Sequence, residues 1–300
     1  MPVSHLNINA ILQGQAGDLL AAGKIDEALA EGEKALATAR EAFKIEERYR
    51  ALVVQALENL AEIKNEAGQP EAARPLYEEA LDEALKAQLD LPVLAQIRTS
   101  LATLLDTLGK EAEAVPVYEQ AIKDLEAMTP PDMQTAGQLR NNLALTYKRM
   151  DKLALAEQHY LRALEALEGS EGSESEMVAS ICNNLGGLYY AAGFADQAKD
   201  MFDDAMTVRL KLLGPNHRDV AQSHSNMATV QHELGDNEGA QRSYEQALRI
   251  LETHMPQEAE SYEAIRNDYI ALLGSIQEDR KAAAFQKRMD KVLAQATTVA

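Results

Sequence analysis

The sequence predicts an all-α chain of stacked antiparallel helix pairs, an α-solenoid, and three observations support that fold class. Turn residues recur at Gly68, Gly109, Asp151, Gly193 and Gly235, in steps of 41, 42, 42 and 42 residues, and Gly23 lies 45 residues before Gly68. Ala, Leu and Glu, which lose little rotamer freedom in a helix, dominate the composition. Apolar residues recur at helical spacing around each turn. A fixed period of this size indicates supersecondary units that bury their apolar faces only by stacking.

The stretch from 179 to 206 shows how one unit is built. Leu185 and Leu188 give a first helix an apolar stripe, and Gly193 ends that helix because glycine adopts the left-handed conformation easily. A second helix follows, with alanines where the two helices cross closely and Phe202 to fill the gap between them. The unit is therefore predicted to be a helix, a tight turn and a second helix.

The other units repeat these positions, counted from each turn residue. Plus five holds Ala28, Ala73, Ala114, Ala156, Ala198 and Ala240. Plus nine holds Tyr77, Tyr118, Tyr160, Phe202 and Tyr244. Plus twelve holds Ala35, Ala80, Ala121, Ala163, Ala205 and Ala247. Minus eight holds Leu60, Leu101, Leu143, Leu185 and Met227, and minus seven holds Ala61, Ala102, Ala144, Gly186 and Ala228.

These positions predict one continuous array over residues 1–300. The first repeat is degenerate, because Gly32 stands at its aromatic position, and the last resembles a cap, with Asp268 and Tyr269 aligned but no aromatic residue at plus nine. Terminal units are expected to differ, since each presents one face to water. The predicted repeats are 9–50, 54–90, 95–128, 137–168, 179–213, 221–254 and 263–296.

The order of leucine, small residue, turn, alanine, aromatic residue and alanine resembles the tetratricopeptide repeat. Several strings are similar to the kinesin light chain type of that repeat, at 74–81, 115–122, 141–147 and 213–221. No heptad coiled coil precedes the array, so the resemblance is one of repeat type. It implies a right-handed superhelix in which the first helix of each pair lines the concave side.

Polar residues share the face of each first helix opposite the apolar stripe. Spacings of three and four place them on one side of the helix. Minus nine holds Asn59, Ser100, Asn142, Asn184 and Asn226. Minus ten holds Glu58, Thr99, Asn141, Asn183, Ser225 and Asn267. Minus thirteen holds Gln55, Gln96, Gln138, Ser180 and Gln222.

An amide side chain offers two donors and one acceptor, which match the acceptor and the donor of a peptide group. Stacked amides are therefore predicted to hold an extended peptide by its backbone. The alternative is that the minus-nine asparagines bond neighbouring backbone and fix the repeat geometry. The predicted contact residues are Gln96, Gln138, Asn141, Asn142, Leu145, Asn183, Asn184, Tyr190, Gln222, Ser225 and Asn226.

Acidic residues stack beside the early part of this predicted groove. Glu58, Glu62 and Glu66 follow one another on one helix and are predicted to receive Lys or Arg of a ligand. The alternative is a solvated acidic face. Leu145 and Tyr190 make the middle of the groove less polar and leave room for an apolar side chain.

Composition limits the partners and the compartment. The formal net charge of −19 argues against nucleic acid and anionic membranes as partners. Cys182 is the only cysteine, which suits a reducing compartment, and the first residues lack the pattern of a secretory signal. We therefore expect a cytoplasmic protein. His217, His224 and His232 are spaced too widely to share a metal ion, so no metal site is predicted. No cofactor and no catalytic residues are predicted either.

The sequence thus predicts a non-enzymatic adaptor that binds an extended segment of another protein, including one with basic residues. Two alternatives remain. One is a regulatory sensor in which a short peptide changes the pitch of the superhelix, since each unit contacts only its neighbours. The other is a scaffold that self-assembles through the ends of the array.

Overall fold

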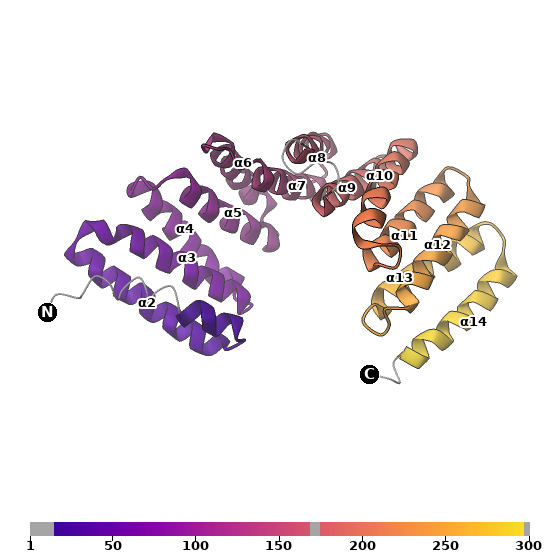
Figure 1. Cartoon of the computed structure of the whole chain (residues 1–300), viewed down its shortest axis with the longest axis horizontal. Helices are drawn as coiled ribbons and strands as arrows, with labels where there is room; N and C mark the ends of the chain where they lie inside the picture. The colour runs from indigo at the N-terminus through magenta and orange to yellow at the C-terminus, as the bar shows by residue number, and fades with distance from the viewer. Residues whose placement is uncertain (1–14, 169–174, 297–300) are drawn as a thin grey trace. The chain divides into compact units, whose positions relative to one another are not determined.

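The computed structural model describes residues 15–168 and 175–296, and every regular element in those ranges is a helix (Figure 1). The predicted all-α class is confirmed. Residues 15–21 are also helical, and a short 3-10 helix covers Glu47–Tyr49. The first of the α-helices are α2 (Ile25–Ile45), α3 (Arg50–Glu66), α4 (Pro70–Lys86), α5 (Leu91–Thr107), α6 (Glu111–Ala127) and α7 (Met133–Arg149). They are followed by α8 (Leu153–Glu168), α9 (Glu176–Ala191), α10 (Ala195–Leu213), α11 (Arg218–Glu233), α12 (Asn237–Glu252), α13 (Ala259–Ser275) and α14 (Asp279–Ala296).

The chain divides into two compact units, Met1–Asp151 and Lys152–Ala300. In the first unit each helix from α2 to α7 packs on the next along the chain, and in the second the same holds from α8 to α14 (Figure 1). Contacts between neighbours along the chain are those of an α-solenoid. The beginning of the predicted first repeat, residues 9–14, lies outside the described residues.

The turn inside each helix pair has one geometry. Gly68 has a φ of 71° and donates its backbone N–H to Asn65 O at 3.0 Å, while Gln69 donates to Lys64 O at 2.8 Å. This pair of bonds satisfies the last free carbonyls of the first helix and requires a left-handed residue. Asp151, where the glycine is missing, also lies in that region with a φ of 58°.

The alanine positions are where the helices cross most closely. At plus five all six alanines have no exposed surface, and at plus twelve five of the six have none. Between them stand the aromatic rings, of which Tyr118 and Tyr160 are fully enclosed. A ring flanked by two methyl groups fills the gap between the helices at interior density.

Two glycines inside helices depart from the repeat for a steric reason. A Cβ on Gly32 would lie 3.1 Å from a side-chain carbon of Leu60. At this position α2 therefore lies close to α3, whereas the other repeats have an aromatic ring here. A Cβ on Gly186 would lie 2.8 Å from the ring of Phe202. In both places the neighbouring side chain occupies the space that a methyl group would need.

Candidate functional site

Three amide side chains form a relay across two neighbouring first helices in the second unit. Gln222 Nε2 donates to Asn226 Oδ1 at 2.9 Å along α11. Asn226 Nδ2 then donates to Asn183 Oδ1 on α9 at 2.6 Å. These are residues that the sequence placed on the amide face, and the structure brings them into contact. We call this set the amide relay.

The amide relay keeps hydrogen-bonding capacity for a ligand. Among the described residues, Asn226 is bonded to other side chains and to no backbone group. Its second Nδ2 hydrogen has no described partner, and neither do the Nδ2 group of Asn183 and Oε1 of Gln222. Asn183 and Asn226 are half-buried and Gln222 is exposed. The relay therefore presents both donors and an acceptor at the surface of α9 and α11.

The first unit links its first helices through different side chains. Thr146 Oγ1 on α7 donates to Asp106 Oδ1 on α5 at 2.7 Å, and Arg149 forms an ion pair with the same carboxylate. Asn141 Nδ2 donates to Asn142 Oδ1 at 3.4 Å within α7. In the first unit, α5 and α7 are therefore joined by a hydrogen bond and an ion pair to Asp106, and the amide contact lies within α7.

The remaining predicted contact residues differ in exposure. Asn141 and Ser225, both at minus ten, are buried with 8% and 5% of their surface exposed. They offer little surface to a ligand. The half-buried residues of the set are Gln138, Asn142, Leu145, Asn183, Asn184 and Asn226. The exposed ones are Gln96, Tyr190 and Gln222.

The acidic residues of α3 do gather beside α5. Glu58 is half-buried and is hydrogen-bonded to Gln96, whereas Glu62 and Glu66 are exposed. Burial, and then the charge of Glu62, raise the pKa of Glu58 to about 7, although the bond from Gln96 acts in the opposite direction. Burial also raises the pKa of Tyr77 to about 12. The patch therefore holds a carboxyl group that titrates near neutral pH.

A cavity of about 370 Å³ opens beside the amide relay in the second unit. Of its lining residues, only Tyr190 is among the contact residues predicted from the sequence. The signal for another was present, because Asp268 occupies minus nine of the last repeat, counted from Gln277, whose φ is 63°. We call this cavity the tyrosine pocket; it is lined by Tyr190, Thr229, His232, Tyr244, Asp268, Ala271, Leu272 and Ser275.

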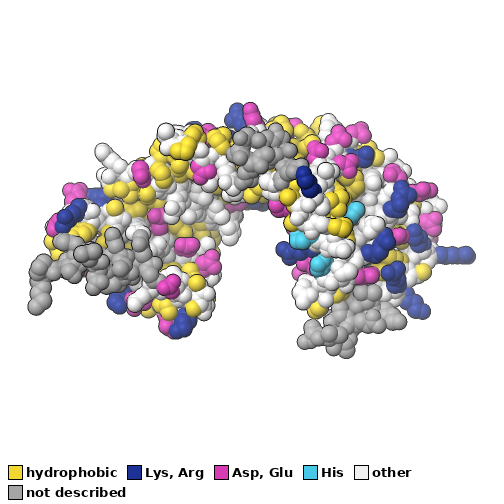
Figure 2. Space-filling model, in the orientation of Figure 1, with side chains coloured by type: hydrophobic (Ala, Val, Ile, Leu, Met, Phe, Trp, Pro, Cys, Tyr) yellow, Lys and Arg dark blue, Asp and Glu magenta, His cyan; other side chains and the backbone are white. Residues whose placement is uncertain are grey.

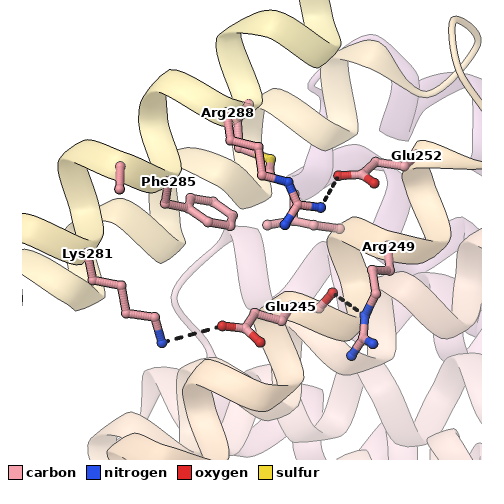
Figure 3. A pocket seen from close by; sticks show the side chains of 9 residues that line it. Glu245, Arg249, Glu252, Lys281, Phe285 and Arg288 are labelled. Carbon is pink, nitrogen blue, oxygen red and sulfur yellow. Dashed lines mark hydrogen bonds and ion pairs between the residues drawn. The ribbon is translucent and has the colours of Figure 1, made fainter.

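A second cavity, of about 420 Å³, lies between the second helices α12 and α14 (Figure 3). Lys281 Nζ is 3.4 Å from Glu245 Oε1, and Arg288 is 3.6 Å from Glu252 Oε1. Each carboxylate also accepts a hydrogen bond from a tyrosine hydroxyl of α13. Its acids and two of its cations are therefore already paired, and these bonds fasten α14 to the preceding helices.

Charged side chains cover both units. Acidic groups are spread over the visible surface, and several Lys and Arg side chains lie around α12 and α14 (Figure 2). Among the side chains of residues 15–168 and 175–290, no group of three His, Cys, Asp or Glu is placed to hold a metal ion. No helix in the described part of the chain is long and apolar enough to cross a membrane.

Family models for the tetratricopeptide repeat match most of the chain. One matches residues 50–127 and 177–253, and a second matches residues 138–174. A search of curated protein sequences found no match.

Solved structures show the same fold. The crystal structure of BtubC (BKLC) from P. vanneervenii has 29% identity and a TM-score of 0.64, over 75% of this chain and 90% of that chain. Kinesin light chain-like repeats from Podosopora anserina have 19% identity and a TM-score of 0.58, over 68% and 97%. A signal transduction ATPase with a tetratricopeptide repeat sensor, from Pyrococcus horikoshii, has 14% identity and a TM-score of 0.71, over 95% and 43%. At their identities, the last two are evidence of fold alone.

Proposed function

The chain belongs to the tetratricopeptide repeat family, and from that premise we propose that it is a non-enzymatic adaptor that holds an extended segment of another protein on its first helices. Tetratricopeptide repeats are protein-interaction units, and the described repeats of this chain share a left-handed residue at the turn between their two helices. The amide relay of the second unit carries the proposal. It places three amides in contact on the surface where a bound segment would lie.

The chemistry of the relay fits a peptide backbone. A peptide group needs one acceptor for its N–H and one donor for its C=O. Gln222 Oε1 supplies the acceptor, and the remaining Nδ2 hydrogens of Asn183 and Asn226 supply donors. Because the three side chains bond one another, their orientations are held before a ligand arrives, which lowers the entropy lost on binding.

The acidic patch supplies a preference for basic segments. Glu62 and Glu66 are exposed on α3, and Glu58 lies half-buried beside them. Burial, and then the charge of Glu62, raise the pKa of Glu58, and a Lys or Arg side chain placed there would favour its ionised form. On this proposal the relay bonds the backbone of a segment at the second unit, and the patch binds basic side chains at the first unit.

Binding of peptides selected from a random phage-displayed library tests the proposal. Peptides selected on the wild-type chain should bind the double variant Asn183→Ala, Asn226→Ala more weakly by roughly fivefold to a hundredfold, since each neutral hydrogen bond contributes about 0.5–1.5 kcal/mol. Fluorescence anisotropy of a labelled peptide gives both affinities.

A matched control removes two amides from second helices. The double variant Gln197→Ala, Gln246→Ala changes exposed residues of α10 and α12 and should bind as the wild type does. Unchanged affinity in the Asn183, Asn226 variant, or failure to select any peptide, would contradict the proposed function. Among the selected peptides, the basic ones should bind more weakly to a variant in which Glu58 and Glu62 are replaced by Lys.

A further inference from the structure

The tyrosine pocket contains a carboxylate with no described partner. Asp268 lies on α13, and among the side chains of residues 15–168 and 175–290 no hydrogen bond or ion pair reaches its carboxylate. Partial desolvation alone raises the pKa of this carboxyl, although much of the side chain is exposed, and no cation or donor opposes it. Its negative charge also raises the pKa of the neighbouring Tyr244. A positive group in the pocket would therefore meet an uncompensated negative charge.

Two aromatic rings stand in the same cavity. Tyr244 is buried with 5% of its surface exposed, whereas Tyr190 keeps 38% exposed at the surface of the pocket. The face of a tyrosine ring attracts a cation within about 6 Å of its centroid. An exposed ring beside a lone carboxylate is a suitable environment for a planar cation.

The other polar groups of the pocket bond to one another. Thr229 Oγ1 is 3.2 Å from Tyr244 Oη, and Ser275 Oγ is 3.3 Å from His232 Nε2. Their hydroxyl oxygens can each accept a further hydrogen bond. The pocket therefore offers several acceptors around a volume of about 370 Å³.

We propose that the tyrosine pocket receives an arginine side chain of the bound partner segment. This inference rests on the proposed function, because it assigns a residue of the ligand that the first helices hold. Asp268 occupies at minus nine the position that Asn226 occupies one repeat earlier. The carboxylate therefore continues the row of the amide relay, and the pocket takes a side chain from the segment whose backbone the relay bonds.

Arginine fits this lining better than lysine. A guanidinium is planar, carries five N–H donors and stacks on aromatic faces. Its charge suits Asp268, its planar face suits the ring of Tyr190, and its five donors suit the hydroxyl groups of the lining. An ammonium group is compact and strongly hydrated, so it satisfies fewer of these acceptors at once.

Titration of the full chain with N-acetyl-arginine amide, followed by two-dimensional amide NMR, tests the pocket without a peptide. We expect saturable shifts at the backbone amides of Tyr190, Thr229 and Asp268, and none with N-acetyl-citrulline amide, which has the same shape and no charge. Asp268→Asn should weaken arginine amide binding by at least about tenfold. The variant should fold, because the exposed side chain has no described partner to lose.

Asp204→Asn is the matched control, since Asp204 is an exposed aspartate of α10 whose pKa is also raised by burial. It should bind arginine amide as the wild type does. Equal binding of the arginine and citrulline amides, or equal binding by the wild type and Asp268→Asn, would overturn the proposal.

Peptide selection separates this inference from the proposed function. On the wild-type chain, selected peptides should share an arginine at one fixed position. Selection on Asp268→Asn should lose that preference and keep the rest of the pattern. Arginine amide binding with no selected peptide would contradict the adaptor function alone, whereas selected peptides without a fixed arginine would contradict the pocket alone.

Discussion

The side-chain amide of Asn226 donates to Oδ1 of Asn183 at 2.6 Å, across 43 residues of sequence. The two residues lie on the first helices of consecutive repeats, α11 and α9. This hydrogen bond joins neighbouring repeats on the polar face of their first helices, opposite the apolar stripe. The same bond therefore contributes to stability and prepares the proposed binding surface.

A double-mutant cycle on this pair measures its share in stability. Asn183→Ala and Asn226→Ala should show a coupling energy of about 0.5–1.5 kcal/mol, the usual contribution of a neutral hydrogen bond. Urea unfolding of the wild type, both single variants and the double variant gives the value. Coupling near zero would mean that the bond does not form in solution.

Gly186→Ala should destabilise the chain although alanine is the better helix former. Its Cβ would lie 2.8 Å from the ring of Phe202 and 3.2 Å from Ala198 O, so the helices must move apart. We expect a net loss of about 1–2 kcal/mol after the gain in helix propensity. Gly274→Ala in α13 is the control, because its Cβ would meet nothing within 4 Å. It should stabilise by up to about 1 kcal/mol.

Substitutions at two turn residues should change the free energy of unfolding in opposite directions. Asp151 has a φ of 58°, which costs energy for any residue with a Cβ, so Asp151→Gly should raise the unfolding free energy by about 0.5–1 kcal/mol. Gly109 has a φ of 66°, and Gly109→Ala should lower it by about 1–2 kcal/mol. Thermal unfolding of the two variants should move the midpoint in opposite directions. A shift in the same direction would contradict the turn assignment.

Glu58→Gln should remove a pH dependence of stability. The pKa of Glu58 is raised from 4.5 to about 7, so the folded state holds this proton more tightly than the unfolded state does. Its contribution is therefore complete below pH 4.5 and is lost as the pH rises through about 7, by on the order of 3 kcal/mol. The difference in urea unfolding between wild type and variant should grow over that window in favour of the variant.

Glu71→Gln is the control for this titration, because Glu71 is exposed on α4. The stability difference between Glu58→Gln and the wild type should change more over that window than the difference for Glu71→Gln does. Equal changes for the two variants would show that the carboxylate of Glu58 is not desolvated in solution.

The repeat positions were predictable because they depend on spacing alone. The left-handed conformation of Asp151 and the complete burial of Ala156 and Tyr160 follow from the 42-residue period and the 3.6-residue turn of a helix. The positive φ of Asp151 was implied by its position in the repeat, although the residue is not a glycine. Local sequence and global fold agree at these places.

Exposure and pairing on the first helices were not predictable from register. Residues at minus ten include the half-buried Asn183, the buried Asn141 and Ser225, and the exposed Asn267, which is bonded to Arg266. Which of these reaches the surface depends on the size and rotamers of neighbours from other helices. The bond from Asn226 to Asn183 and the lone carboxylate of Asp268 depend on the same packing, so only coordinates reveal them.

The alanines at plus five and plus twelve have consequences for how such chains diverge. They determine helix spacing from inside the second helices, whereas the amide relay lies on the first helices α9 and α11. Mutations can therefore exchange what a repeat recognises without altering what holds it together. Transplanting the exposed residues of one repeat onto another should carry its preference with them, and duplication of a single unit would supply new recognition on an unchanged frame.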